Sequence, residues 1–254
     1  MELYYIVLLF ILGAMLGSFL GCMGYRIPNK IKTTFPSSYC ENCKKTLKWY
    51  MNIPIISYIF LKGKCAYCKT KINPLYFYTE LLCSILFVVN HIRFGFGLNF
   101  YIACILTCVL IVTIVSDFIY YYISDRVIVF STISLIIVLY IFTKTNVFVN
   151  ILHAAIMFGI MYLIKLIGNY AFKKESLGDG DIKLMGVIGL AIGLYNSLVA
   201  LFIACILGIV FGLIQKHKNK EGIIPFGPFL LIGSLLVLYC NNYMDIFWKF
   251  FIWF

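Results

Sequence analysis

Long apolar segments recur along this chain, and they constrain its fold more than any other feature. Seven of them approach the ~20 residues that a helix needs to cross a bilayer, and an eighth, 182–194, is shorter. Because 63% of the residues are hydrophobic and only 12% are charged, we predict an all-α polytopic membrane protein. The seven longer segments are 3–25, 76–92, 98–117, 127–143, 147–168, 198–214 and 223–241.

Basic residues decide whether the short segment crosses, because Lys and Arg are retained on the cytoplasmic side of short loops. If 182–194 crosses, all but three of the 21 basic residues fall on one side. If it does not cross, the cluster Lys216–Lys220 changes sides. We therefore predict eight transmembrane helices with both termini outside the cytoplasm. The net charge of +11 then reflects topology, with contact to membrane lipid as a second role and no need for nucleic acid.

The longest polar stretch divides the chain into three parts. The segment 26–75 interrupts the membrane pattern with four prolines and four cysteines, and we expect it to be a small inserted cytoplasmic domain. It separates a first transmembrane helix at 1–25 from a transmembrane domain at 76–254. Only Glu2 precedes the first apolar segment, so we expect that segment to remain as a helix and not to be a cleaved signal.

The cysteines of the inserted domain form two C-x-x-C pairs, Cys40 with Cys43 and Cys65 with Cys68. Two intervening residues let both sulfurs of a pair turn toward one point, and two such pairs offer the thiolate set typical of zinc. Two disulfides and a redox role are the alternatives, and the reducing cytoplasm disfavours the disulfides. We predict a structural Zn²⁺ site that replaces much of the core such a small domain lacks.

A few acidic residues stand at the predicted membrane borders, where a charge is costly. Asp117 ends the third long apolar segment, and Asp179 and Asp181 precede the short one, while Asp125 is expected to cap the next helix. Such residues are functional-site candidates. Two carboxylates that share one site can hold one proton between them and accept another from water. The residues alone leave three interpretations open: a hydrolytic pair, a proton relay or ion site, and plain helix-end charges.

Several short motifs follow one another in a fixed order along nearly the whole chain. They are Gly17-Ser-Phe-Leu20, Tyr25-Arg-Ile-Pro28, the segment 52–58 between the cysteine pairs, Tyr76–Glu80, Gly178-Asp-Gly-Asp181-Ile-Lys183 and Pro225-Phe-Gly-Pro228. Together and in this order they resemble the bacterial type IV prepilin peptidase family, membrane aspartic proteases of the G-x-G-D type.

The resemblance implies that Asp117 and Asp181 are the catalytic acids, which activate water to cut the leader from type IV prepilin or pseudopilin precursors. It also implies N-methylation of the new amino terminus by S-adenosylmethionine, an activity that the family associates with the zinc domain. Glu80 and Asp125 are candidates to assist that second step. The implied location is the bacterial cytoplasmic (inner) membrane, with the zinc domain and both acids on the cytoplasmic side.

The alternative function is a zinc-stabilised membrane transporter or scaffold in which the two aspartates relay protons. Two other kinds of hydrolase find no support, because neither an H-E-x-x-H nor a G-x-S-x-G motif occurs in the chain. An experiment can distinguish the peptidase from the transporter, because only the peptidase shortens a precursor protein.

Overall fold

The structure, a computed structural model, describes residues 2–32, 37–40, 42–143, 147–215 and 224–240. Within these ranges the chain is helical and carries only two isolated β-bridges, which confirms the all-α prediction. Eight longer helices of the described chain lie at the predicted apolar segments. They are α1 (Glu2–Arg26), α3 (Pro74–Phe94), α4 (Leu98–Tyr120), α5 (Asp125–Thr143), α6 (Val147–Phe172), α7 (Asp179–Ile192), α8 (Leu194–Gln215) and α9 (Phe226–Tyr239).

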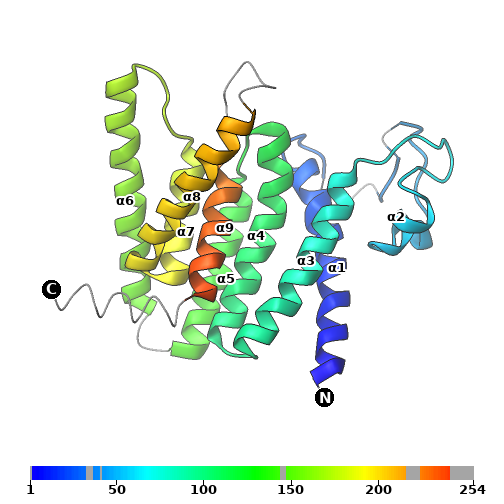
Figure 1. Cartoon of the computed structure of the whole chain (residues 1–254), viewed down its shortest axis with the longest axis horizontal. Helices are drawn as coiled ribbons and strands as arrows, with labels where there is room; N and C mark the ends of the chain where they lie inside the picture. Colours follow the sequence, from blue (N-terminus) through cyan, green and yellow to red (C-terminus); the bar gives the residue numbers. More distant parts are fainter. Residues whose placement is uncertain (1, 33–36, 41, 144–146, 216–223, 241–254) are drawn as a thin grey trace.

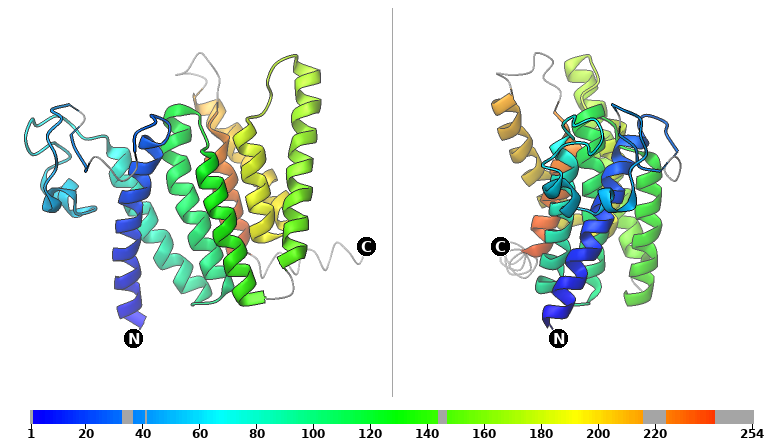
Figure 2. Two further views of the ribbon diagram at one scale, coloured as in Figure 1. Left: turned by 180° about the vertical axis from the view of Figure 1, so that it is seen from behind. Right: turned by 90° about the vertical axis from the view of Figure 1, so that its right-hand side faces the viewer.

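The longer helices run alternately up and down, so their ends gather at two opposite faces of a bundle (Figure 1). The inserted domain, which contains η1 (Trp49–Asn52) and α2 (Ile56–Phe60), lies at the face where α1 and α4 end and α7 begins (Figures 1 and 2). We call this the small-domain face. The start of α1 and the links from α3 to α4 and from α7 to α8 lie at the opposite face.

Helix length separates six clear spans from two shorter helices. By length and composition, α1, α3, α4, α5, α6 and α8 can each cross a membrane. Helices α7 and α9 have 14 residues each, about 21 Å at a rise of 1.5 Å per residue. The segment predicted for α9 was 223–241, and both of its end residues lie outside the described ranges, as does the basic cluster Lys216–Lys220. A crossing by all eight helices stays a prediction.

The two short helices form the centre of the bundle. Helix α7 is buried without interruption from Val187 to Ile192, and α9 from Gly227 to Leu231. Helix α4, the most buried of the long helices, packs against α9, while α5 and α6 pack against α7. The second half of α7 and the first turns of α9 are therefore surrounded mainly by protein.

Helix α1 lies close against α3 because glycines face the contact. A Cβ atom added at Gly13 would stand 2.7 Å from Ser84 Cα, and one added at Gly17 would stand 2.8 Å from Glu80 Cα. Small residues let helices approach in this way inside membranes. Since α1 precedes the inserted domain in the chain and α3 follows it, their contact holds the two ends of that domain close together.

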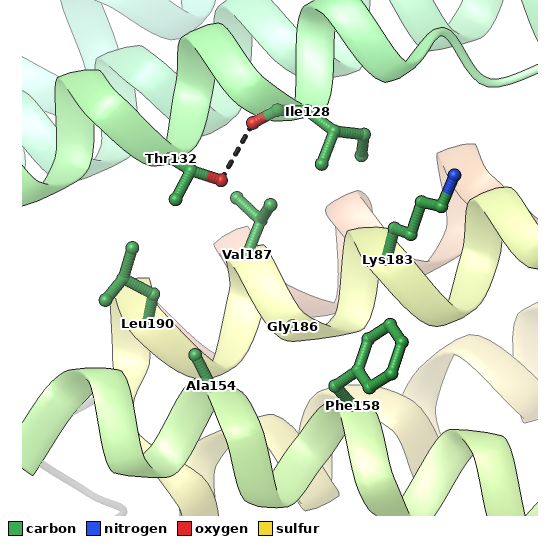
Figure 3. Close-up of a pocket in the computed structure, with 8 residues that line it drawn as sticks. All are labelled: Ile128, Thr132, Ala154, Phe158, Lys183, Gly186, Val187 and Leu190. Atoms are coloured by element: carbon green, nitrogen blue, oxygen red, sulfur yellow. Dashed lines mark hydrogen bonds between the residues drawn. The ribbon is translucent and has the colours of Figure 1, made fainter.

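An apolar groove of about 290 Å³ opens between α5, α6 and α7 (Figure 3). Neither Asp117 nor Asp181 lines it. Lys183 stands at one end of the groove, and residues two apart on a helix point to nearly opposite sides, so Asp181 faces away from it. The groove is lined by Ile128, Thr132, Ala154, Phe158, Lys183, Gly186, Val187 and Leu190.

Candidate active site and metal centre

Asp117 lies in the last turn of α4, at the small-domain face. The helix ends where Tyr121 takes a left-handed conformation with φ 50°, and the Tyr121 N–H donates to the Asp117 carbonyl at 3.0 Å. The Asp117 residue is only 6% exposed. Its Oδ2 accepts a hydrogen bond of 3.1 Å from the N–H of Gly227, in the first turn of α9, where N–H groups have no partner within the helix. The start of α9 therefore orients this carboxylate.

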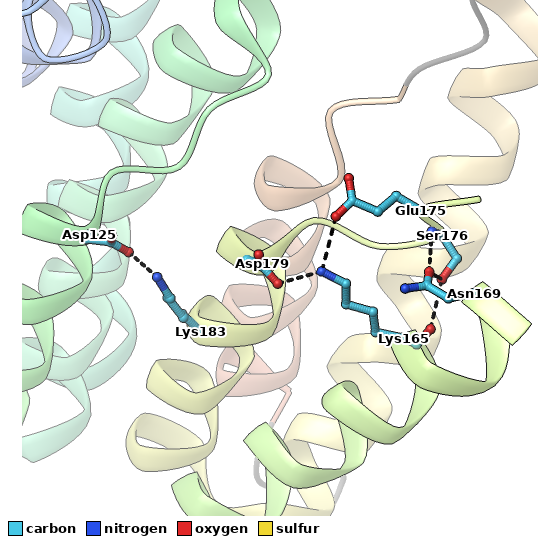
Figure 4. Close-up of polar contacts among 7 residues, drawn as sticks. All are labelled: Asp125, Lys165, Asn169, Glu175, Ser176, Asp179 and Lys183. Carbon is cyan, nitrogen blue, oxygen red and sulfur yellow. Dashed lines mark hydrogen bonds and ion pairs between the residues drawn. The ribbon is translucent and has the colours of Figure 1, made fainter. Parts of the chain in front are cut away.

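Asp181 lies in the first turn of α7, two residues after Asp179. The Asp181 Oδ1 atom is buried and has no hydrogen-bond partner among the described residues. Asp179 is its opposite: its side chain is 72% exposed and accepts a hydrogen bond of 2.6 Å from Lys165 Nζ (Figure 4). The G-x-G-D segment thus directs one acid outward to Lys165, whose own side chain is only 12% exposed, and keeps a carboxylate oxygen of the other inside the protein.

The side chain of Ile123, in the link between α4 and α5, fills the space between the starts of α7 and α9. A Cβ atom added at Gly180 would stand 2.7 Å from Ile123 Cβ, and one added at Gly227 would stand 2.8 Å from Ile123 Cδ1. Only residues without a Cβ fit at these two positions with the present packing. The two predicted catalytic acids, Asp117 and Asp181, are brought within electrostatic reach of each other beside this contact.

The surroundings of the two acids favour proton transfer over ion pairing. In the described part of the chain, the salt bridges of Lys165 and Lys183 go to other acids, so neither Asp117 nor Asp181 is neutralised by a lysine. Two carboxylates that are close together and shielded from bulk water avoid carrying two full charges, which favours one shared proton. A pair in this condition can take a proton from water on one side and give one on the other.

Asp125 does not cap α5 as predicted, because the helix begins at Asp125 itself. Its Oδ1 atom accepts a hydrogen bond of 2.6 Å from Lys183 Nζ on α7 (Figure 4). The two side chains are 68% and 42% exposed, and ion pairs in contact with solvent add little stability. Asp125 is therefore engaged away from the inward-facing Asp181.

The four predicted metal ligands gather at one point of the inserted domain. The Sγ atoms of Cys40, Cys43, Cys65 and Cys68 all lie within 4.8 Å of one another, and no disulfide joins them. The Sγ atoms of Cys40 and Cys68 are 3.7 Å apart. Sulfurs bound tetrahedrally at the usual zinc distance stand about 3.8 Å from one another. The cluster fits a zinc ion better than it fits two disulfides.

The two cysteine pairs repeat one backbone pattern that the sequence does not display. In each pair the residue after the second cysteine takes a left-handed conformation, Lys44 with φ 58° and Lys69 with φ 60°. Each first cysteine donates its N–H to the carbonyl five residues later, at 3.0 and 2.8 Å. The matching β-bridges are Tyr39 with Thr46 and Lys64 with Lys71. Both turns point their sulfurs toward the shared centre, as two zinc knuckles do.

Neighbouring polar groups prepare Cys68 as a ligand. The Thr70 Oγ1 atom lies 3.2 Å from its sulfur, and Asn42 Nδ2 lies 3.8 Å from it. Hydrogen bonds from Thr70 lower the pKa of Cys68 to about 5, which favours the thiolate. The thiolate is the form that binds metal, and such outer partners hold ligands in place.

Purified protein is expected to contain about one zinc ion per chain, and Cys40→Ser or Cys65→Ser is expected to remove most of it, because three sulfurs hold the ion far less well than four. Elemental analysis by mass spectrometry measures the content. Cys205→Ser serves as the matched control, since that thiol is exposed on α8. Unchanged zinc in both knuckle variants would contradict the metal site.

Sequence reasoning assigned no role to Gly227 or Ile123. The segment Pro225-Phe-Gly-Pro228 was noted only because it resembles a family motif. Its chemistry could also have indicated a hydrogen-bond donor: Pro228 has no N–H, so Gly227 is one of the few first-turn donors of its helix. Ile123 gave no signal, because it is one apolar residue among many in this chain.

Comparison with known proteins yields matches along most of the chain. Residues 11–94 match the family described as Bacterial Peptidase A24 N-terminal domain, and residues 104–213 match the Type IV leader peptidase family. No solved structure matches.

Three curated relatives show how far the likeness extends. The Prepilin leader peptidase/N-methyltransferase of Bacillus subtilis (strain 168) is 32% identical over 246 residues, which cover 95% of this chain and 97% of that protein. A protein of the same name from Neisseria gonorrhoeae is 28% identical, over 91% of this chain and 89% of its own. The Type 4 prepilin-like proteins leader peptide-processing enzyme of Escherichia coli O78:H11 is 27% identical, over 89% and 91%. This chain belongs to the type IV leader peptidase family.

Proposed function

We propose that this chain is a membrane aspartic endopeptidase that removes the leader peptide from type IV prepilin or pseudopilin precursors. The names of the three relatives describe prepilin leader processing and support this function. The observation that carries the catalytic assignment is the inward-facing pair, Asp117 and Asp181. Gly227 holds one acid, and the Oδ1 atom of the other is buried with no hydrogen-bond partner in the described part of the chain.

In the proposed reaction, the ionised acid takes a proton from a water molecule whose oxygen attacks the scissile carbonyl carbon. The protonated acid gives its proton to the carbonyl oxygen, so the carbon carries two hydroxyl groups. Breakdown of this species breaks the C–N bond, and a proton passes to the leaving nitrogen, which becomes the new amino terminus. The Gly227 N–H keeps the Asp117 carboxylate in place throughout.

We further propose that the inserted domain at 26–75 faces the cytoplasm, holds a structural zinc ion on Cys40, Cys43, Cys65 and Cys68, and serves N-methylation of the new amino terminus. N-methyltransferase is part of the names of two of the relatives. S-adenosylmethionine, when bound, supplies the methyl group. Asp117 is in the last turn of α4 and Asp181 in the first turn of α7, and these helix ends lie at the small-domain face (Figure 1). The new amine would therefore form on the side where the second step would take place.

Purified protein in detergent, mixed with a type IV prepilin and S-adenosylmethionine, tests both steps. Mass spectrometry of the product is expected to show loss of the leader and the gain of one methyl group at the new amino terminus. Under the transporter alternative the precursor stays intact. A folded, zinc-loaded preparation that leaves the prepilin at full length would contradict the peptidase assignment.

A further inference from the structure

The chain makes an uncommon turn inside the inserted domain, between the two cysteine pairs. Ile55 has φ 63° and ψ −54°, and the N–H of Ile56 donates to the Pro54 carbonyl at 2.6 Å. These values describe a γ-turn with positive φ, which is rare and strained. A β-branched residue at positive φ is a genuine outlier. Such a conformation persists only where the surrounding structure holds it.

The side chain of Glu80 holds this turn. Its Oε2 atom accepts a hydrogen bond of 2.7 Å from the N–H of Ile55. Glu80 stands on α3, and its carboxylate also interacts with the side chain of Ser18 on α1. One carboxylate therefore joins α1, α3 and the inserted domain.

Close packing surrounds this carboxylate. Gly17 brings the α1 backbone against Glu80, since an added Cβ would stand 2.8 Å from Glu80 Cα. On the domain side, the ring of Tyr58 stacks on Phe77 of α3 with the ring centroids 5.0 Å apart. The Glu80 carboxylate is thus engaged in holding neighbouring elements and is not presented as a free base.

We infer that Glu80 is a positioning residue for the methylation step, because it fixes the turn at Ile55 and thereby the inserted domain against the membrane helices. The inference rests on the proposed function, in which that domain serves methylation. The chain ends of the domain, near Arg26 and Asn73, attach it at two points. Together with the stacking of Tyr58 on Phe77, the bond to Ile55 attaches the middle of the domain and limits its rotation about the two chain ends.

Cleavage should not depend on this attachment. The carboxylates proposed for cleavage belong to α4 and α7, whereas the Glu80 carboxylate accepts from Ile55 and interacts with Ser18 of α1. A methyl group, by contrast, moves only when donor and amine are aligned, and a displacement of about 1 Å can cost 10²-fold in rate. A loosened inserted domain is therefore expected to lower the rate of methylation and to leave the rate of cleavage unchanged.

The test uses full-length protein in detergent with a prepilin and S-adenosylmethionine. Glu80→Ala is expected to lower the methylation rate about tenfold or more, with leader cleavage and zinc content unchanged. Glu80→Gln keeps a carbonyl oxygen that accepts from Ile55, so it is expected to restore most of the rate.

A second readout does not depend on activity. Amide hydrogen exchange across residues 53–60 is expected to accelerate in Glu80→Ala and to return toward the wild-type rate in Glu80→Gln. Glu175→Ala is the matched control, because it removes a carboxylate whose side chain is 81% exposed in the link between α6 and α7. That control is expected to change neither methylation nor exchange.

Three results would overturn the inference. The first is equal methylation by the wild type and Glu80→Ala. The second is Glu80→Gln that methylates no better than Glu80→Ala, since a residue acting as a base would be lost in both. The third is loss of zinc and cleavage together with methylation in Glu80→Ala. A wild-type protein that cleaves without methylating contradicts the proposed function instead, and is recognised before any variant is made.

Discussion

Asp181→Asn is expected to lower the rate of leader cleavage by about 10³-fold or more, and Asp117→Asn by a similar factor. Asparagine has nearly the same shape as aspartate but can neither accept a proton from water nor give one to the carbonyl oxygen. At position 117 its amide oxygen can still accept the Gly227 N–H, so the fold is retained. Single-turnover cleavage of a purified prepilin, followed by mass spectrometry, measures the effect.

Two neighbouring acids provide the matched controls for this pair. Asp179→Asn and Asp125→Asn remove exposed carboxylates that pair with Lys165 and Lys183. The pair of Lys183 is exposed on both sides and contributes little, and Lys165 keeps Glu175 as a partner. Both variants are expected to cleave within about threefold of the wild-type rate. Continued cleavage by Asp117→Asn or Asp181→Asn would show that another group activates the water and would favour the proton-relay alternative for this pair.

Gly180→Ala is expected to reduce cleavage by about 10²-fold through a single methyl group. The added Cβ would stand 2.7 Å from Ile123 Cβ, an atom fixed to the backbone, so the start of α7 or the link between α4 and α5 must move. Either movement displaces Asp181 relative to Asp117. The effect is expected in kcat, with zinc content and protein yield unchanged, because the clash is local.

Two further variants test whether the clash itself causes the loss. Gly180→Ala combined with Ile123→Gly removes the facing Cβ and is expected to recover most of the lost activity. Gly159→Ala makes the same change on α6, where an added Cβ meets nothing within 4 Å, and it is expected to be neutral. A Gly180→Ala variant with wild-type kcat would contradict the close approach described between α7 and Ile123.

The sequence was most informative where a pattern has one physical meaning. Apolar segments of bilayer length predicted the helices, and the spacing of Cys40, Cys43, Cys65 and Cys68 predicted a gathered thiol cluster, because two C-x-x-C turns leave few other uses for the sulfurs. The inward orientation of Asp181 and the outward one of Asp179 were not predictable from composition. They follow from helical direction, which depends on where α7 begins.

Other parts of the site depend on contacts between segments far apart in the chain. Gly227 donates a hydrogen bond to Asp117, which lies 110 positions earlier in the chain. No local pattern in either segment predicts this contact. The turn at Ile55 was equally hidden, since a β-branched residue is among the last that sequence rules would place at positive φ. The predicted helix cap at Asp125 was wrong because α5 begins one residue earlier than a cap at that position requires.

The shortness of α7 and α9 has a consequence for the surrounding bilayer. Their length of about 21 Å falls short of the ~30 Å hydrocarbon thickness of a typical membrane, and α6 extends beyond the start of α7 at the small-domain face (Figure 1). If both helices cross as predicted, the start of α7, which carries Asp181, lies nearer the middle of the bilayer than the end of α6 does. A bilayer that meets two such short helices has to thin around them or let their ends lie below the neighbouring headgroups.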